Sequence, residues 1–226
     1  MNHEDTAAAP RSEGAPDDGL SRAQRVYERL KEDIRAGVLR RGERVREETV
    51  ARALGVSRTP VREALARLQA GGLLEVTANG LVVVTISHAQ TLELYAMREV
   101  LEGSAARFAA QHAAPSEVSV LMRLGASFAD AFGDAIRLAD LNRRFHAAIL
   151  DAAHNRYLVR MLEELSDALA LLPGTTFQLP ERGPLAVEEH AAIVEAIAAR
   201  DPDRAEQAAR HHIQQAQEAR LTLMRF

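Results

Sequence analysis

Apolar residues early in the chain recur with a helical period. The apolar positions of the first predicted helix are Val26, Leu30 and Ile34. Ser21 stands before them as a good N-cap, and Gly37 supplies the stop. A second, shorter helix is predicted from about Glu47 to Leu54. The first part of the chain therefore predicts two consecutive helices.

The next segment predicts a helix-turn-helix. Residues 49–65 read T-V-A-R-A-L-G-V-S-R-T-P-V-R-E-A-L, which is a helix, a glycine-containing turn and a second helix. Ser57 is the predicted N-cap of that second helix, and Pro60 stands in its first turn, where proline is tolerated. Its core-facing residues are Val61, Leu65 and Leu68. The polar residues near the opposite face, where base edges are met in a major groove, are Arg58, Thr59 and Arg62.

Two strand-like runs follow, over residues 73–76 and 82–86, separated by Asn79-Gly80. An Asn-Gly pair between apolar runs is a strong signal for a hairpin. A hairpin after a helix-turn-helix makes a winged helix, whose tip is narrow enough to approach a minor groove.

No strand alternation appears after residue 87. The predicted helical stretches cover about 88–113, 116–132, 134–153, 155–172, 184–200 and 202–224. No repeat of fixed period is present, so a compact antiparallel bundle of about six helices is expected. Its predicted core residues include Met97, Leu101, Leu141, Phe145, Leu158, Met161 and Leu165. The fold class is mainly α.

Charge divides the chain into three predicted parts. Residues 1–19 carry one arginine against five acids and indicate a disordered leader. Residues 20–87 carry 13 basic residues against 8 acids, a net charge of +5. Residues 88–226 carry 14 arginines against 19 acids, a net charge of −5. We call residues 20–87 the head and residues 88–226 the body. A basic head joined to an acidic body is typical of a protein whose head binds a polyanion, although chance scatter of surface charge would also produce it.

Composition excludes several classes of protein. The chain has 226 residues and no cysteine, so disulfides, thiolate nucleophiles and cysteine zinc sites are absent. Its 47% hydrophobic and 27% charged residues fit a folded, water-soluble protein. The sequence has neither a run of about 18 apolar residues nor a cationic secretion signal at its start. A bacterial cytoplasmic protein without a membrane partner is expected.

Histidine placement in the body suggests a metal site. Asn142 and His146 are four residues apart and share a helix face, whereas Asp140 lies off that face. His190 and the pair His211-His212 lie on later helices. Such side chains can converge on one ion in a bundle core. Scattered surface or hydrogen-bonded histidines are the competing interpretation.

The head resembles a known family. The sequence G-V-S-R-T-P-V-R-E-A-L over residues 55–65 closely resembles the signature of the GntR family of bacterial transcription regulators. By this resemblance, the candidate operator-reading and phosphate-binding residues are Ser57, Arg58, Thr59 and Arg62, and Asn79 and Gly80 form the wing tip. Some members have a DNA-contacting arginine where this chain has Glu48. Arg46 or Arg52 is the candidate to replace it.

The body resembles the all-helical FCD effector domain of the FadR branch of that family, in its shorter VanR-like form. In that family an aspartate and three histidines bind a divalent metal, and zinc or nickel is the expected ion in this chain. The matching residues here are Asn142, His146, His190 and His212. The neutral amide in place of a carboxylate implies a weaker or more selective site.

Domains of this kind bind small carboxylates, and Arg98 matches a cavity-facing arginine that could clamp one. Pairing of Arg98 with Glu102 one turn away is the competing interpretation.

Together these features predict a DNA-binding transcription regulator. Its operator affinity would be controlled by a small carboxylate at a metal site, and repression is the commoner behaviour of the resembled family. Two heads on a homodimer would read two half-sites of double-stranded operator DNA. A metal-dependent hydrolase stays possible because three histidines can activate water, but no enzyme motif or catalytic residue is present. A metal sensor without an organic effector is the third possibility.

Overall fold

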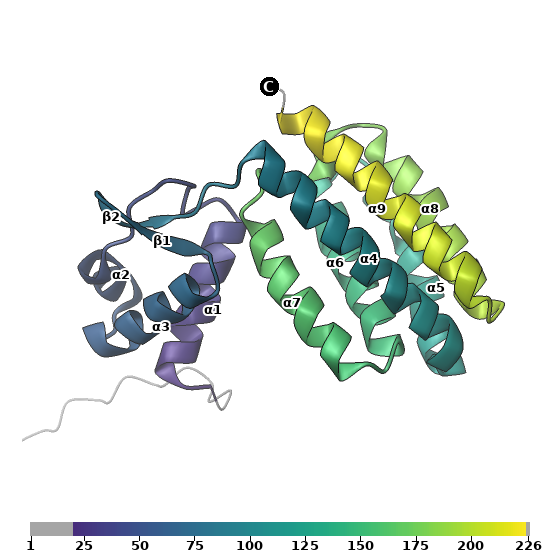
Figure 1. Cartoon of the computed structure of the whole chain (residues 1–226), viewed down its shortest axis with the longest axis horizontal. Helices are drawn as coiled ribbons and strands as arrows, with labels where there is room; N and C mark the ends of the chain where they lie inside the picture. The colour runs from purple at the N-terminus through teal and green to yellow at the C-terminus, as the bar shows by residue number, and fades with distance from the viewer. Residues whose placement is uncertain (1–19, 225–226) are drawn as a thin grey trace, which may run out of the picture.

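The computed structural model describes residues 20–224, so the predicted leader over residues 1–19 lies outside the described residues. The head consists of α1 (Arg22–Arg35), α2 (Glu47–Leu54), α3 (Arg58–Ala70), β1 (Leu74–Thr77) and β2 (Gly80–Val83). The long body helices are α4 (His88–His112), α5 (Pro115–Ser127), α6 (Ala135–Ala152), α7 (Arg156–Ala170), α8 (Arg182–Ala198) and α9 (Pro202–Met224). Short 3-10 turns are η1 (Ala129–Ala131) and η2 (Thr176–Gln178). Figure 1 confirms the predicted fold class, a winged helix followed by a helical bundle.

Local sequence signals explain the head. The Ser21 hydroxyl accepts a hydrogen bond from the backbone N–H of Gln24, so the predicted N-cap of α1 is confirmed. Ser57 stands at the N-cap position of α3, but its side chain makes no capping hydrogen bond. Gly55 ends α2 with φ +64°, a left-handed conformation that glycine adopts without strain. The three helices bury one apolar cluster that includes Val26, Leu30, Val61, Leu65 and Leu68.

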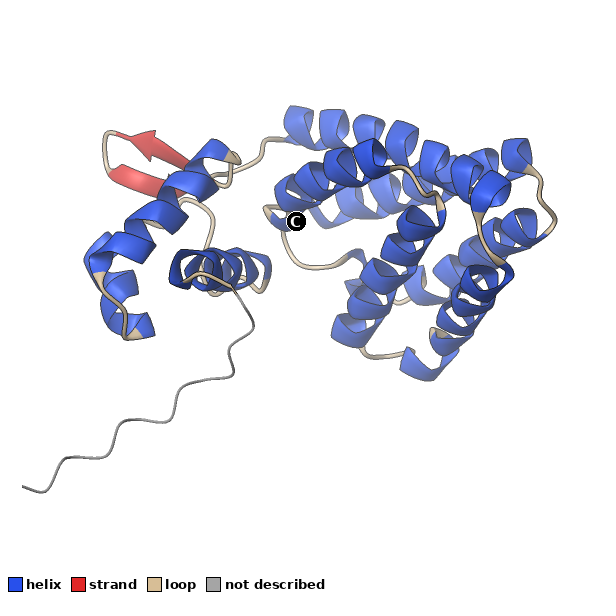
Figure 2. Ribbon diagram, turned by 90° about the horizontal axis from the view of Figure 1, so that it is seen from below, coloured by secondary structure: helices blue, strands red, loops and turns tan. Residues whose placement is uncertain are grey.

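The wing is a short antiparallel hairpin with Leu74 opposite Val83 and Thr77 opposite Gly80. Figure 2 places it at the end of the molecule away from the bundle. The second strand covers Gly80–Val83 instead of the predicted 82–86. It begins earlier because Gly80, at φ +99°, leaves the turn directly. It ends earlier because the chain then runs to Ser87, which caps α4.

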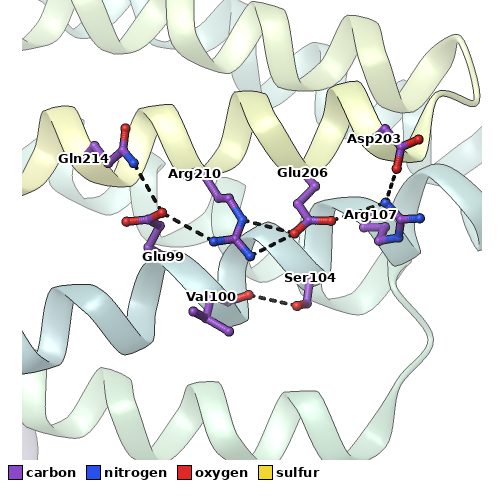
Figure 3. A network of polar contacts seen from close by, with 8 residues as sticks. All are labelled: Glu99, Val100, Ser104, Arg107, Asp203, Glu206, Arg210 and Gln214. Atoms are coloured by element: carbon purple, nitrogen blue, oxygen red, sulfur yellow. Dashed lines mark hydrogen bonds and ion pairs between the residues drawn. The ribbon is translucent and has the colours of Figure 1, made fainter.

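Helices α4 and α9 lie side by side and are joined by a polar network (Figure 3). Arg210 on α9 contacts Glu206 and reaches across to Glu99 on α4. A Cβ atom on Gly103 would lie 2.9 Å from Cγ of Arg210, so glycine allows this close approach. The pairing fixes α9, which carries His212, against α4, which carries Arg98 and Glu102.

The body buries its own apolar core around Phe128, Phe145, Ile193 and Ile197. The prediction of Met97 and Met161 as core residues is wrong, since they are 51% and 55% exposed. Helical spacing gave the period of each helix but not how wide its buried stripe is. None of the helices within residues 20–224 is both long and apolar enough to cross a lipid bilayer.

The head contacts the body through α1 and α7 (Figure 1). Lys31 on α1 forms an ion pair of 2.5 Å with Asp167 on α7. Leu171, which follows α7, packs into the apolar cluster of the head. Its carbonyl accepts a hydrogen bond of 3.1 Å from Arg41. The C-terminal end of α7 is therefore shared between the two regions.

Candidate DNA-reading face and candidate metal centre

The predicted DNA-reading residues lie on the surface of the head. They lie just before α2, in the turn before α3, on α3 and at the wing, and all are exposed except Gly80, which is half-buried. These residues are Arg46, Ser57, Arg58, Thr59, Arg62, Asn79 and Gly80. Burial of Val61, Leu65 and Leu68 against α1 turns the polar side of α3 outward. The geometry suits a helix that enters a major groove by its N-terminal end.

The arginines of α3 do not stand alone. The Arg58 guanidinium contacts the carboxylate of Glu48, and Arg62 donates to Glu47 from Nε at 3.2 Å and from Nη2 at 3.0 Å. The hydrogen bond from Arg62 lowers the pKa of Glu47 below its usual value. Sequence reasoning recorded Glu48 as a departure from the family and missed both pairs. Contacts 10 and 15 residues apart follow no helical period.

In the body, α6, α8 and α9 bring together His146, His190 and His212. One ring nitrogen from each lies within 4.8 Å of the others. Nε2 of His146 and Nε2 of His212 are 3.1 Å apart. The structure therefore brings together the three histidines that the sequence analysis chose from three helices.

Two carboxylates fix the orientation of the His146 and His212 rings. Nδ1 of His146 contacts Glu102 of α4, and Nδ1 of His212 lies 2.6 Å from Oε2 of Glu189. A carboxylate beside Nδ1 favours the tautomer with the proton on that nitrogen, which leaves the lone pair on Nε2. Two lone pairs 3.1 Å apart repel each other, and a cation between them removes that repulsion.

The residues present fit a divalent cation. Both ring nitrogens of His190 and Oδ1 of Asn142 are buried without a hydrogen-bond partner. A buried polar atom without a partner costs about 1–3 kcal/mol, so a metal ligand role explains why they are kept there. Burial lowers the pKa of His190 and of His212 well below the usual value, which keeps these imidazoles neutral and able to bind metal.

The adjacent histidines of α9, His211 and His212, differ in burial. His212 is buried and reaches the cluster, whereas His211 is exposed. Spacing alone could not choose between them because either position can face a neighbouring helix. Asp140, considered as a poorer partner, instead pairs with Arg143 on the surface of α6.

The Glu189 carboxylate that contacts His212 is itself held by a buried arginine. Arg182, at the first position of α8, donates to Glu189 from Nη1 at 3.1 Å and from Nη2 at 2.7 Å. Burial raises the pKa of Glu189, and these hydrogen bonds oppose that rise. Sequence reasoning missed this pair, although the spacing of seven residues, two helical turns, offered a signal.

Arg98 lines a cavity of about 820 Å³ together with Glu102, Asn142 and His146. Nε of Arg98 donates to Glu102, so the pair with Glu102 is present and Arg98 lines the cavity as well. Burial alone would raise the pKa of Glu102, but Arg98 and His146 outweigh it, and the pKa lies well below its usual range. The same cavity reaches Tyr27 and Lys31 of α1 in the head.

A winged helix with an exposed basic helix, joined to a separate helical domain, is typical of a DNA-binding transcription regulator. Residues 22–84 match the family described as "Bacterial regulatory proteins, gntR family", and residues 93–215 match the FCD domain. The chain belongs to the GntR family of bacterial regulatory proteins and carries an FCD domain.

Similar proteins have regulatory names. The chain is 34% identical over 195 residues to a probable D-xylose utilization operon transcriptional repressor of Paenarthrobacter nicotinovorans, covering 84% of this chain and 85% of that one. It is 30% identical over 215 residues to the Glc operon transcriptional activator of Escherichia coli K12, covering 83% and 84%. Among solved structures, E. coli McbR/YncC superposes with a TM-score of 0.80 at 26% identity, covering 91% of this chain and 99% of that one. The chain is a DNA-binding transcriptional regulator.

Proposed function

We propose that this regulator is a homodimeric repressor whose affinity for operator DNA is controlled by a small carboxylate held at a divalent metal in the FCD domain. The convergence of His146, His190 and His212, with the orphaned Oδ1 of Asn142 on the same cavity-lining helix face as His146, carries this proposal. The exposed N-terminal face of α3, with the wing, would bind the DNA.

Zinc or nickel is the expected ion. Imidazole suits both metals, and the amide oxygen of Asn142 adds a ligand without charge. The four neutral donors would leave the ion with its full positive charge, so its chemistry here is to attract an anion. A carboxylate is the simplest anion that such a site would take.

The cavity supports a carboxylate ligand. Asn142, His146 and Arg98 line one volume, so a ligand in it would meet both the metal ligands and a guanidinium. Glu102 already holds Nε of Arg98. Arg98 would therefore assist a ligand carboxylate with the donors that remain to it, and a bulky polyanion would meet repulsion from Glu102.

The link to DNA runs through α7. Leu162 of α7 lines the cavity, and Asp167 and Leu171 contact the head. A ligand controls DNA affinity only if it binds the DNA-competent and the incompetent arrangements differently. A shift of α7 on ligand binding would change how the two heads of a dimer are spaced over two half-sites.

The test begins with a duplex selected from a randomised library by the purified protein, called the selected duplex below. Its affinity is measured for metal-free, zinc-loaded and nickel-loaded protein, each with and without a panel of small carboxylates. We expect a carboxylate to weaken binding only in metal-loaded protein. Control by metal alone would identify a metal sensor, and no dependence on either would reject the proposed function.

His190→Ala tests the metal centre itself. We expect the bound metal to fall below one ion per chain in elemental analysis, and the carboxylate response to disappear. Because His190 is stacked on Phe145 in the core, the alanine variant also leaves a cavity. His146→Gln, at a less buried position, gives a second measurement. Full metal content in both variants would show that the cluster is not the site.

A further inference from the structure

The free head holds two of the three arginines of α3, Arg58 and Arg62, in ion pairs with α2. Arg58 contacts Glu48, and Arg62 makes two hydrogen bonds with Glu47. Arg58 and Glu48 are 58% and 65% exposed, so both members of that pair stay accessible to a DNA duplex. Carboxylates therefore stand on the face where this protein meets a polyanion.

Helix stability alone does not account for these pairs. Glu47 and Glu48 lie in the first turn of α2, where the helix dipole favours acidic residues. That effect requires only the position in the turn. It does not require the side chains to reach α3, as both do. The two carboxylates thus have a second role beyond their own helix.

Non-specific and specific binding respond differently to such pairs. Binding to phosphates depends on the number of cations that displace counterions, so a paired arginine contributes less to it. Binding to a base edge depends on N–H groups aimed at an acceptor. A guanidinium carries several N–H groups, and the contacts with Glu47 use only Nε and Nη2 of Arg62.

We propose that Glu47 and Glu48 are specificity-determining residues of the head. They neutralise Arg62 and Arg58 against phosphate and hold the guanidinium groups oriented for base edges. They weaken binding to arbitrary DNA more than binding to the operator. The protein leaves non-operator DNA more readily and gains discrimination without any contact between these carboxylates and a base.

The test compares Glu47→Gln and Glu48→Gln with wild-type protein on two probes, the selected duplex and a mixed-sequence duplex of equal length. Affinity for each is measured by fluorescence anisotropy over a range of salt concentrations. We expect each variant to bind the mixed-sequence duplex about fivefold more tightly. The salt dependence of that binding should steepen by about 0.9 in log–log slope for each arginine released. Affinity for the selected duplex should change less, so the ratio of the two affinities falls.

Glu32→Gln is the matched control, since Glu32 forms an exposed ion pair with Arg35 on α1, within the same head. It changes the net charge equally without touching the recognition helix. Glu48→Asp should restore most of the wild-type ratio because it keeps the charge. The proposal is wrong if both glutamine variants match Glu32→Gln in affinity and salt slope. It is also wrong if the ratio of the two affinities stays at its wild-type value in both glutamine variants, because the carboxylates would then not contribute to discrimination.

Discussion

The head and the body each contain an ion pair between an arginine and a glutamate, but the two pairs differ in exposure. Arg62 and Glu47 in the head form a two-point contact, and so do Arg182 and Glu189 in the body. The side chains of the head pair are 71% and 26% exposed, whereas those of the body pair are 4% and 7% exposed. An exposed pair gives up its partner at little cost, but a buried charge that loses its partner is strongly destabilising. Burial decides whether an arginine can exchange partners.

The difference in exposure gives the two pairs different roles: Arg62 lies on a surface open to a partner, whereas Arg182 supports a buried site. Arg62 can exchange or share Glu47 when DNA arrives, because water already reaches both groups. Arg182 stays with Glu189, and Glu189 in turn holds Nδ1 of His212. The head therefore keeps its charged groups exposed on the surface, while the body holds its groups in place by buried contacts.

The largest expected effect comes from removing the exposed arginines. Arg58→Ala or Arg62→Ala should weaken binding to the selected duplex about a hundredfold in a dimer, because a good contact from arginine to a base is worth about 1–3 kcal/mol in each head. Anisotropy titration measures the loss. The thermal unfolding midpoint should stay unchanged, since both side chains are exposed. Unchanged DNA binding would show that α3 is not the recognition helix.

A smaller effect, on metal affinity, is expected from changing the buried Glu189. Glu189→Gln keeps the shape of the side chain but removes the charge that orients His212, and outer-shell changes of this kind cost about 10–100-fold in metal affinity. It also leaves the buried Arg182 without its charged partner, so the thermal unfolding midpoint of the variant should fall. Competition with a chromogenic zinc chelator measures it.

Glu195→Gln is the control for this prediction, because Glu195 lies on the same helix in an exposed pair with Arg204. Equal zinc affinity of both variants would assign Glu189 a purely structural role. DNA binding by the folded, metal-free protein should not change in either variant, since the contact of Lys31 and Arg41 with Asp167 and Leu171 does not involve α8.

The two regions also differ in how well the sequence predicts them. The DNA-reading residues on α3 lie within one turn-and-helix segment, so their arrangement follows from local geometry. Asn142 and His146 were predicted to share a face for the same reason. The choice of His212 over His211, the exposure of Met97, and the partners Glu102 and Glu189 depend on how α4, α6, α8 and α9 pack. Spacing within one helix carries no information on packing between helices.

Removing the ion pair between the head and the body should have the smallest effect on stability and on DNA affinity. Asp167→Asn removes the ion pair with Lys31, which is only partly buried, so the free energy of unfolding should fall by less than about 1 kcal/mol. Affinity for the selected duplex should change no more than about threefold. The carboxylate response should weaken further than that if α7 carries the ligand signal, as the proposed function requires.

Lys31 is the only lysine in the chain, which makes this contact directly measurable. A zero-length carbodiimide cross-link between Lys31 and Asp167 should form in wild-type protein and be absent from Asp167→Asn, as read by peptide mass spectrometry. Cross-linked protein should bind the selected duplex with the same affinity whether or not the carboxylate is present, because α7 can no longer move relative to α1. Glu163→Gln, an exposed change on the same helix, is the control. A full carboxylate response in the cross-linked protein would mean that the signal reaches the head by another route, such as the chain from β2 to α4.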